Sequence, residues 1–122
     1  MKKIILDCDP GMDDSMAIVM AAKSESLDLL AVTTVNGNYP AEITAKNARK
    51  VLEMLGRTDI PVARGMAQPM VHPCPKDPFS HGADGQAENF LPEPQMALHP
   101  LHAVDLIIDL VKKNPGEITL LC

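Results

Sequence analysis

Cysteines are few, and none stands in a spacing that suggests a metal site or a disulfide framework. Cys8, Cys74 and Cys122 are odd in number and include no CxxC pair. Small secreted domains usually depend on an even set of paired cysteines, whereas proteins of reducing compartments do not. The sequence therefore favours a reduced, cytoplasmic compartment.

Long apolar runs and an excess of positive charge are also missing. The apolar stretch 16–22 is far too short to span a bilayer, and Asp7 interrupts the apolar segment behind Met1-Lys2-Lys3 too early for a signal peptide. The net charge of -5 argues against a surface for nucleic-acid phosphates, because such surfaces are usually basic. We expect a soluble protein that binds neither a membrane nor a nucleic acid.

What the sequence does contain is a regular alternation of strand and helix patterns. With 46% hydrophobic and 22% charged residues, its 122 residues suit one globular domain. Short, continuously apolar segments predict strands, and helix formers with an apolar stripe predict helices. The order predicts an α/β fold with an open, mostly parallel sheet and helices on both faces, as in Rossmann-like proteins. The expected strands are 3–6, 27–35, 60–63 and 118–122, and the expected helices are 13–23, 41–55 and 101–113.

The first expected helix, 13–23, is apolar on most of its sides. Its helix formers include Met16, Ala17 and Met20, with aspartates in the first turn. We therefore expect this helix to be well buried. The eight methionines of the chain are likewise expected to fill gaps in the core rather than to form a binding surface.

The segment 64–100 has little periodicity and is rich in proline. A structureless stretch of this length inside a compact domain usually forms a lid or a binding loop. Its tip, His81-Gly82-Ala83-Asp84-Gly85, combines two glycines with two polar side chains that could act on a ligand. The interpretation is a proline-rich lid at 64–100 within a single domain that spans 1–122.

The last expected strand, 118–122, ends the sequence with no covering helix after it. In open α/β sheets the carboxyl ends of the strands carry the ligands and the loops that bind them. We therefore expect the sequence to be the N-terminal portion of a longer domain, truncated before the sheet is complete.

Four aspartates, Asp7, Asp9, Asp13 and Asp14, crowd around the turn Pro10-Gly11 after the first strand. An aspartate at a helix start accepts bonds from free backbone N–H groups and complements the helix dipole. That structural role accounts for Asp13 or Asp14, but not for Asp7 and Asp9 before the turn. Converging carboxylates repel one another unless a cation neutralises them, so the functional interpretation is a hard divalent cation held by oxygen ligands.

Two common metal sites do not fit this pattern. An EF-hand loop needs Gly at its sixth position and Glu at its twelfth, and counting from Asp7 or from Asp9 finds neither. Zinc is disfavoured because Cys8 points away from both aspartates along a strand and no histidine lies nearby. Calcium and magnesium are both left open by the residues alone, and either ion needs further ligands from elsewhere in the fold.

The aspartate motif also resembles a known family signature. Residues 7–14, DCDPGMDD, followed by SMAI, resemble the signature of the inosine–uridine-preferring nucleoside hydrolases. Residues 33–38, TTVNGN, resemble the second site loop of that family, and 81–85 resemble its mobile loop. The likeness runs in order through essentially the whole chain, although the chains of the family are more than twice as long.

The resemblance implies hydrolysis of the N-glycosidic bond of ribonucleosides to ribose and free base, with Ca²⁺ as cofactor. It makes Asp9 and Asp14 the calcium ligands. Asp9 is also expected to take the proton from the calcium-bound water that attacks the anomeric carbon. Asp7 is expected to support these residues by contacting them rather than the metal.

The same resemblance assigns the substrate-binding residues. Asp13 is expected to hydrogen-bond the ribose hydroxyls, Asn38 to line the site near the water and the sugar, and His81 to close over the base from the lid. The complete protein is expected to form a homodimer or homotetramer. The chain lacks later ligands and the groups that handle the leaving base, so we expect it to be incomplete for activity. It also departs from many members at Gln86-Ala87, where they have Leu-Gly, which bears on lid closure and base preference.

Two alternatives stay open at this point. A haloacid-dehalogenase-like phosphatase with Mg²⁺ also opens with a strand that ends in Asp-x-Asp. A threonine usually follows that motif closely, whereas Pro10-Gly11-Met12 follows here, and a phosphatase leaves Asp13-Asp14 unexplained. The other alternative is a non-catalytic fragment that binds calcium or ribose without turnover.

Overall fold

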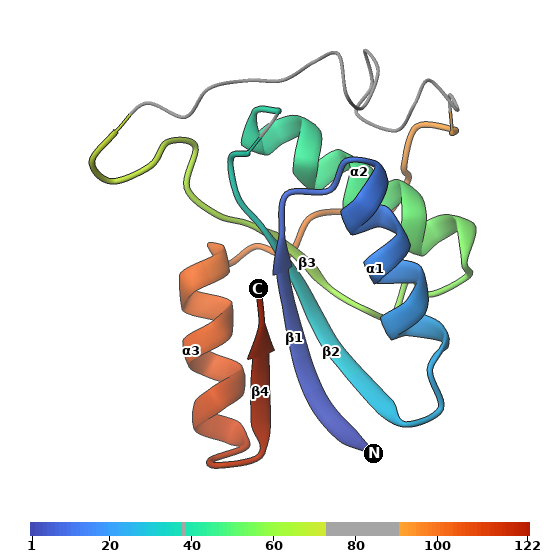
Figure 1. The fold of residues 1–122 in the computed structure, drawn as a ribbon, viewed down its shortest axis with the longest axis vertical. Coiled ribbons are helices and arrows are strands. Elements are labelled where there is room, and N and C mark those ends of the chain that lie inside the picture. The colour runs from blue at the N-terminus through green and yellow to red at the C-terminus, as the bar shows by residue number, and fades with distance from the viewer. Residues whose placement is uncertain (38, 73–90) are drawn as a thin grey trace.

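The computed structural model describes residues 1–37, 39–72 and 91–122, and it shows a sheet between two layers of helices (Figure 1). The strands are β1 (Lys2–Cys8), β2 (Leu27–Thr34), β3 (Val62–Arg64) and β4 (Ile118–Leu121). The helices are α1 (Met12–Lys23), α2 (Ala41–Met54) and α3 (Ala103–Lys113). Every expected helix and strand is therefore found, with ends that differ by no more than a few residues.

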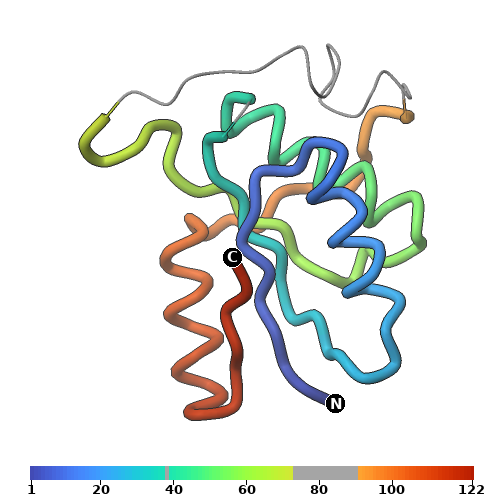
Figure 2. Tube along the Cα trace, viewed as in Figure 1, coloured from blue at the N-terminus to red at the C-terminus, as the bar shows by residue number. Residues whose placement is uncertain are grey.

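The four strands pair in the order β3-β2-β1-β4, and every pair is parallel. Because the strands are parallel, their carboxyl ends lie at one edge of the sheet, and Figure 2 shows the segments after β1, β2 and β3 leaving the sheet at that end. The predicted α/β fold is confirmed. Loops that are far apart in the sequence are brought together at this edge.

Strand β1 lies in the middle of the sheet and is apolar on both faces, as expected for a covered parallel strand. Its side chains alternate, so that Ile4 and Leu6 pack against α1 and α2 while Ile5 packs on the other face against α3. The larger cluster also takes in Ile18 of α1 and Leu52 of α2. The core thus has two halves, and α1 and α2 cover the half from which the aspartate turn emerges.

Helix α1 is less buried than its composition predicts. Only Ile18, Ala21 and Ala22 are buried, whereas Met16 and Met20 are 61% and 70% exposed. The expectation that methionines fill the core is also wrong, because seven of the eight are exposed in the described residues. A helix that is apolar on most sides can still lie with one face on a sheet, and composition does not reveal which face that is.

The proline-rich segment is only partly described. Residues 65–72 and 91–102 contain no helix or strand. The second part runs along α2, where the Glu53 carboxylate accepts hydrogen bonds from the backbone N–H groups of Gln95 (2.7 Å) and Met96 (3.2 Å). The tip 81–85 lies outside the described residues, so the lid stays a prediction. Within those residues, no helix has the length and apolar character to cross a bilayer.

Candidate active site

The aspartate turn connects the carboxyl end of β1 to the start of α1. Strand β1 ends at Cys8, and α1 begins at Met12 with Asp13 and Asp14 in its first turn. Gly11 at the N-cap provides no side-chain hydrogen bond to the free N–H groups of the helix. The carboxylates of the first turn therefore lie beside a helix N-terminus, which carries a partial positive charge.

Asp9 and Asp14 approach each other across this turn. The backbone N–H of Asp9 donates to Oδ2 of Asp14 at 2.9 Å. The pKa of Asp14 is raised from 3.8 to about 6, chiefly by burial, then by a side-chain hydrogen bond with Asp9 and by the negative charges of Asp9 and Asp13; the backbone hydrogen bond partly opposes the rise. The two carboxyl groups thus lie close together in a partly buried position, and Asp14 keeps its proton up to a higher pH than an ordinary aspartate does.

Replacing Asp14 with Asn is expected to stabilise the chain at pH 7 when divalent cations are removed. The raised pKa means that ionised Asp14 opposes folding. Below about pH 4 the carboxyl is protonated in both the folded and the unfolded state, so the penalty vanishes, and above about pH 6 the penalty is complete. The unfolding free energy of the wild type should therefore fall relative to Asp14→Asn between these values, by about 1 kcal/mol once partial solvent exposure is allowed for.

Urea denaturation in a chelator across this pH range measures the difference. Asn keeps an oxygen that can accept the Asp9 N–H, so the change removes charge and little else. Asp105→Asn, in the first turn of α3, is the matched control and is expected to bring no gain. A loss of stability at pH 7 in Asp14→Asn would contradict the interpretation.

Asp7 and Cys8 lie apart from this pair. Oγ1 of Thr33 on β2 donates to Oδ1 of Asp7 at 2.6 Å, on the face of the sheet that α3 covers. Cys8 points into the opposite half of the core, and burial, together with the surrounding aspartates, raises the pKa of its thiol far above the usual range. Cys8 is therefore a neutral, unreactive core residue. The supporting role of Asp7 stays a prediction.

A metal could use two of these carboxylates. Residues 1–37, 39–72 and 91–122 hold no group of three or more His, Cys, Asp or Glu side chains placed to bind a metal. Asp9 and Asp14 nevertheless fit part of a calcium site, because they are hard oxygen donors that lie side by side; burial first, and then the neighbouring Asp9, raises the pKa of Asp14. Six to eight oxygens are usual for Ca²⁺, so most ligands of such a site would be other groups. Asn38 and His81, expected near the substrate, lie outside the described residues.

A buried residue that we did not predict from the sequence, Asn47, holds the aspartate turn. It lies on α2, is 1% exposed, and its Nδ2 donates to the carbonyl oxygen of Pro10 at 3.0 Å. Pro10 is itself fully buried, so this carbonyl needs a partner within the protein. The signal in the sequence was an amide on the otherwise apolar stripe of the helix expected at 41–55.

Replacing Asn47 with Ala is expected to lower the unfolding free energy by about 2 kcal/mol, because it leaves the Pro10 carbonyl without this donor. Urea denaturation measures the loss. Glu42→Ala, an exposed position on the same helix, should change the value by less than about 0.5 kcal/mol. Equal effects of the two substitutions would contradict the role of Asn47.

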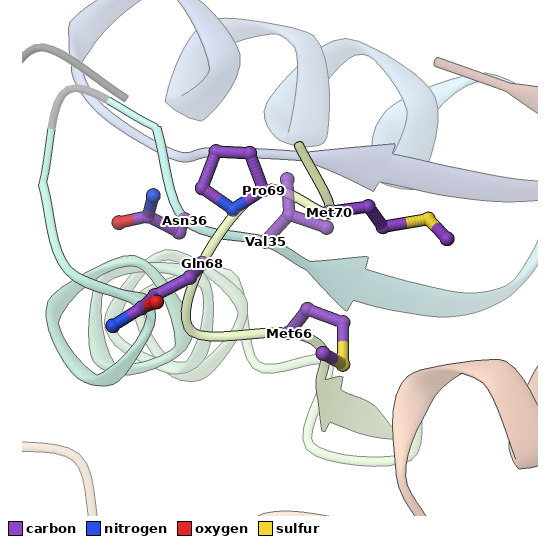
Figure 3. A pocket seen from close by; sticks show the side chains of 6 residues that line it. All are labelled: Val35, Asn36, Met66, Gln68, Pro69 and Met70. Carbon is purple, nitrogen blue, oxygen red and sulfur yellow. The ribbon is translucent and has the colours of Figure 1, made fainter. Parts of the chain in front are cut away.

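The loops after β2 and β3 line an open pocket of about 240 Å³ (Figure 3). The backbone N–H of Asn36 donates to the carbonyl oxygen of Met66 at 3.3 Å, and that of Gly65 donates to the carbonyl of Thr34 at 2.7 Å. These bonds hold the two loops together. The pocket is lined by Val35, Asn36, Met66, Gln68, Pro69 and Met70.

The sequence and the fold match those of known proteins along almost the entire chain. The model of the family described as inosine-uridine preferring nucleoside hydrolase matches residues 4–122. The chain belongs to this family. Membership sets aside the phosphatase alternative, because the whole matched segment, including the aspartate turn, is that of nucleoside hydrolases.

The names of relatives in the family specify different nucleoside substrates. The inosine-uridine preferring nucleoside hydrolase of Leishmania major is 43% identical over 121 residues, which are 98% of this chain and 38% of the relative. A pyrimidine-specific ribonucleoside hydrolase of Photobacterium profundum is 42% identical over 119 residues, with the same coverage of both chains. A solved plant nucleoside hydrolase matches the fold with a TM-score of 0.92 at 40% identity, over 98% of this chain and 38% of that structure. The chain therefore spans a little over a third of the length of these nucleoside hydrolases.

Proposed function

We propose that this chain contributes the metal- and sugar-binding part of an enzyme that hydrolyses ribonucleosides to ribose and free base. The observation that carries the proposal is the pair of adjacent carboxyl groups, Asp9 and Asp14, at the carboxyl end of β1. Family membership supports the reaction class, and the negative charges of Asp9 and Asp13 beside the partly buried Asp14 support a site where positive charge is needed. Base preference is left open, since the named relatives include both inosine-uridine preferring and pyrimidine-specific enzymes.

Each aspartate has a distinct task in this proposal. Asp9 and Asp14 hold Ca²⁺, which, when bound, binds vicinal hydroxyls and lowers the pKa of water. Asp9 accepts a proton from the attacking water, as a carboxylate within hydrogen-bond reach can. Asp13, which is exposed in the first turn of α1, binds the ribose hydroxyls. The carboxylates also stabilise the positive charge that develops on the sugar as the N-glycosidic bond breaks.

The remaining groups of the reaction are proposed to come from polypeptide equivalent to the rest of a family-length protein. Within the described residues β4 pairs only with β1, so its outer edge offers free backbone groups. Helix α3 exposes an apolar stripe beside this strand, and such a surface usually marks a contact. The exposed residues are Val104, Ile108 and Val111 on α3, Leu101 just before it, and Leu120 and Leu121 on β4.

The test is ribose release from inosine and from uridine. It compares this chain with a chimera in which residues 1–122 precede the remaining residues of the Leishmania relative, each with calcium or with a chelator. We expect calcium-dependent release by the chimera and none by the 122 residues alone. Ribose release that is the same with calcium and with the chelator would contradict the calcium site.

The non-catalytic alternative gives a different result in the same experiment. A calcium- or ribose-binding protein would bind calcium or ribose in titration calorimetry, yet its chimera would release no ribose. A parallel assay for phosphate release from a phosphomonoester should be negative. The cytoplasmic location and the homodimeric or homotetrameric assembly stay predictions, and size-exclusion chromatography of the active chimera tests the assembly.

A further inference from the structure

The backbone of the loop after β2 lies directly against the Asp9 side chain. A Cβ atom added at Gly37 would lie 1.9 Å from Oδ2, 2.4 Å from Cγ and 2.5 Å from Cβ of Asp9. Contacts below 3.0 Å are essentially never made by a real Cβ. The φ angle of Gly37 is not in the left-handed region, in contrast to Gly56 at 71°. Glycine is therefore required here for space and not for backbone conformation.

A change in the Asp9 rotamer would not make room for a larger residue. Rotation about χ1 carries Cγ and the carboxylate oxygens away, but it leaves Cβ of Asp9 where it is. The contact of 2.5 Å with that atom would persist in every rotamer. Either the end of β1 or the loop after β2 would have to move.

The loop is held in place by bonds on each side of Gly37. The backbone N–H of Val35 donates to the carbonyl oxygen of Cys8 at 3.1 Å, one residue before Asp9, and that of Asn36 donates to Met66. The N–H of Gly37 itself donates to the carbonyl of Tyr39, a residue whose side chain is buried. A withdrawal of the loop would strain or break these bonds, so a side chain at Gly37 would press on Asp9 instead.

We propose that Gly37 is a positioning residue for Asp9. Its bare backbone forms the wall against which the Asp9 side chain lies, and this wall directs the carboxylate toward Asp14. The inference rests on the proposed function in one respect only, namely the role of Asp9 as calcium ligand and proton acceptor. The contact between Gly37 and Asp9 exists independently of that role, and the two can be tested separately.

The contact is tested by a double-mutant cycle in urea, with a chelator present, on wild type, Gly37→Ala, Asp9→Gly and the double variant. Only glycine at position 9 removes the Cβ contact. Gly37→Ala is expected to lower the urea midpoint by about 1 M in the wild-type background and by less than half as much in Asp9→Gly. Equal shifts in both backgrounds would overturn the proposal. If Gly37→Ala alone fails to fold, recovery of folding in the double variant is the expected result, and no recovery overturns it.

The positioning role is tested by calcium titration calorimetry on folded variants of the chimera, because most calcium ligands lie outside these 122 residues. Gly37→Ala should raise the calcium Kd by about 10-fold or more. Gly65→Ala is the matched control, because its Cβ would meet the Thr34 carbonyl oxygen at 2.6 Å but does not meet Asp9. It should lower the urea midpoint and leave the Kd within about twofold, whereas equal changes in Kd would reduce Gly37 to a packing residue. If the unsubstituted chimera binds no calcium, the proposed function fails, and the double-mutant cycle still decides the contact.

Discussion

Asp9→Asn is expected to reduce ribose release by the active chimera by about 10³-fold or more. Asn keeps the size of Asp and one oxygen ligand, but it cannot accept the proton of the attacking water and it carries no negative charge. The pKa of Asp14 should fall at the same time, because the neighbouring Asp9 contributes to raising it. A single substitution thus removes the base and half of the charge that would hold the metal.

Steady-state kinetics with inosine and uridine, at saturating calcium, measure the loss. Asp28→Asn is the matched control, since Asp28 lies on the same sheet but pairs with Lys3 near the amino end of β1. It should leave the rate within about twofold. If Asp9→Asn kept more than about a tenth of the rate, Asp9 would not be the base and another group would have to be sought.

Ile18→Ala should lower the unfolding free energy of the chain by about 2 to 5 kcal/mol. Ile18 is fully buried on the inner face of α1, in the cluster that joins this helix to β1 and α2. The substitution removes buried apolar surface and leaves a cavity that close-packed neighbours fill only in part. Because α1 carries Asp13 and Asp14, a loosened helix should also weaken calcium binding.

Urea unfolding followed by far-ultraviolet circular dichroism measures the change. Met16→Ala, two residues away on the same helix, is the matched control, because its side chain is 61% exposed. The control should change the unfolding free energy by less than about 0.5 kcal/mol. Losses of similar size at both positions would mean that α1 is buried on both faces and would contradict the described packing.

Much of the local structure could be predicted from the order of residues. Continuous apolar segments such as Leu27–Thr34 predict buried parallel strands, and the regular alternation with helices predicts the α/β fold. Helix α3 begins and ends within two residues of the expected positions, because His102 caps its start and Asn114-Pro115 follows its end. Such signals are local, so no knowledge of the partners of each residue is needed to interpret them.

The burial of helix α1 could not be predicted in the same way. Its composition is apolar on most sides, yet Met16 and Met20 face outward and Ile18 faces inward. The choice between faces depends on where the helix axis lies over the sheet, and it is made by long-range packing. The exposed methionines follow from that packing and not from any property of methionine itself.

For the candidate site, too, some residues could be predicted from the sequence and others only from the tertiary structure. By itself, the sequence determined the order of helices and strands, the family, and Asp9, Asp13 and Asp14 as candidate residues, because a motif of contiguous residues carries its chemistry wherever it is placed. Only the tertiary structure decided that Asp7 bonds to Thr33 on the face opposite Cys8, that Asn47 holds the turn from α2, and that Gly37 lies against Asp9. These contacts join residues that are separated along the chain, and the parallel register of the strands, together with the packing of α2 on them, is the physical reason that they meet.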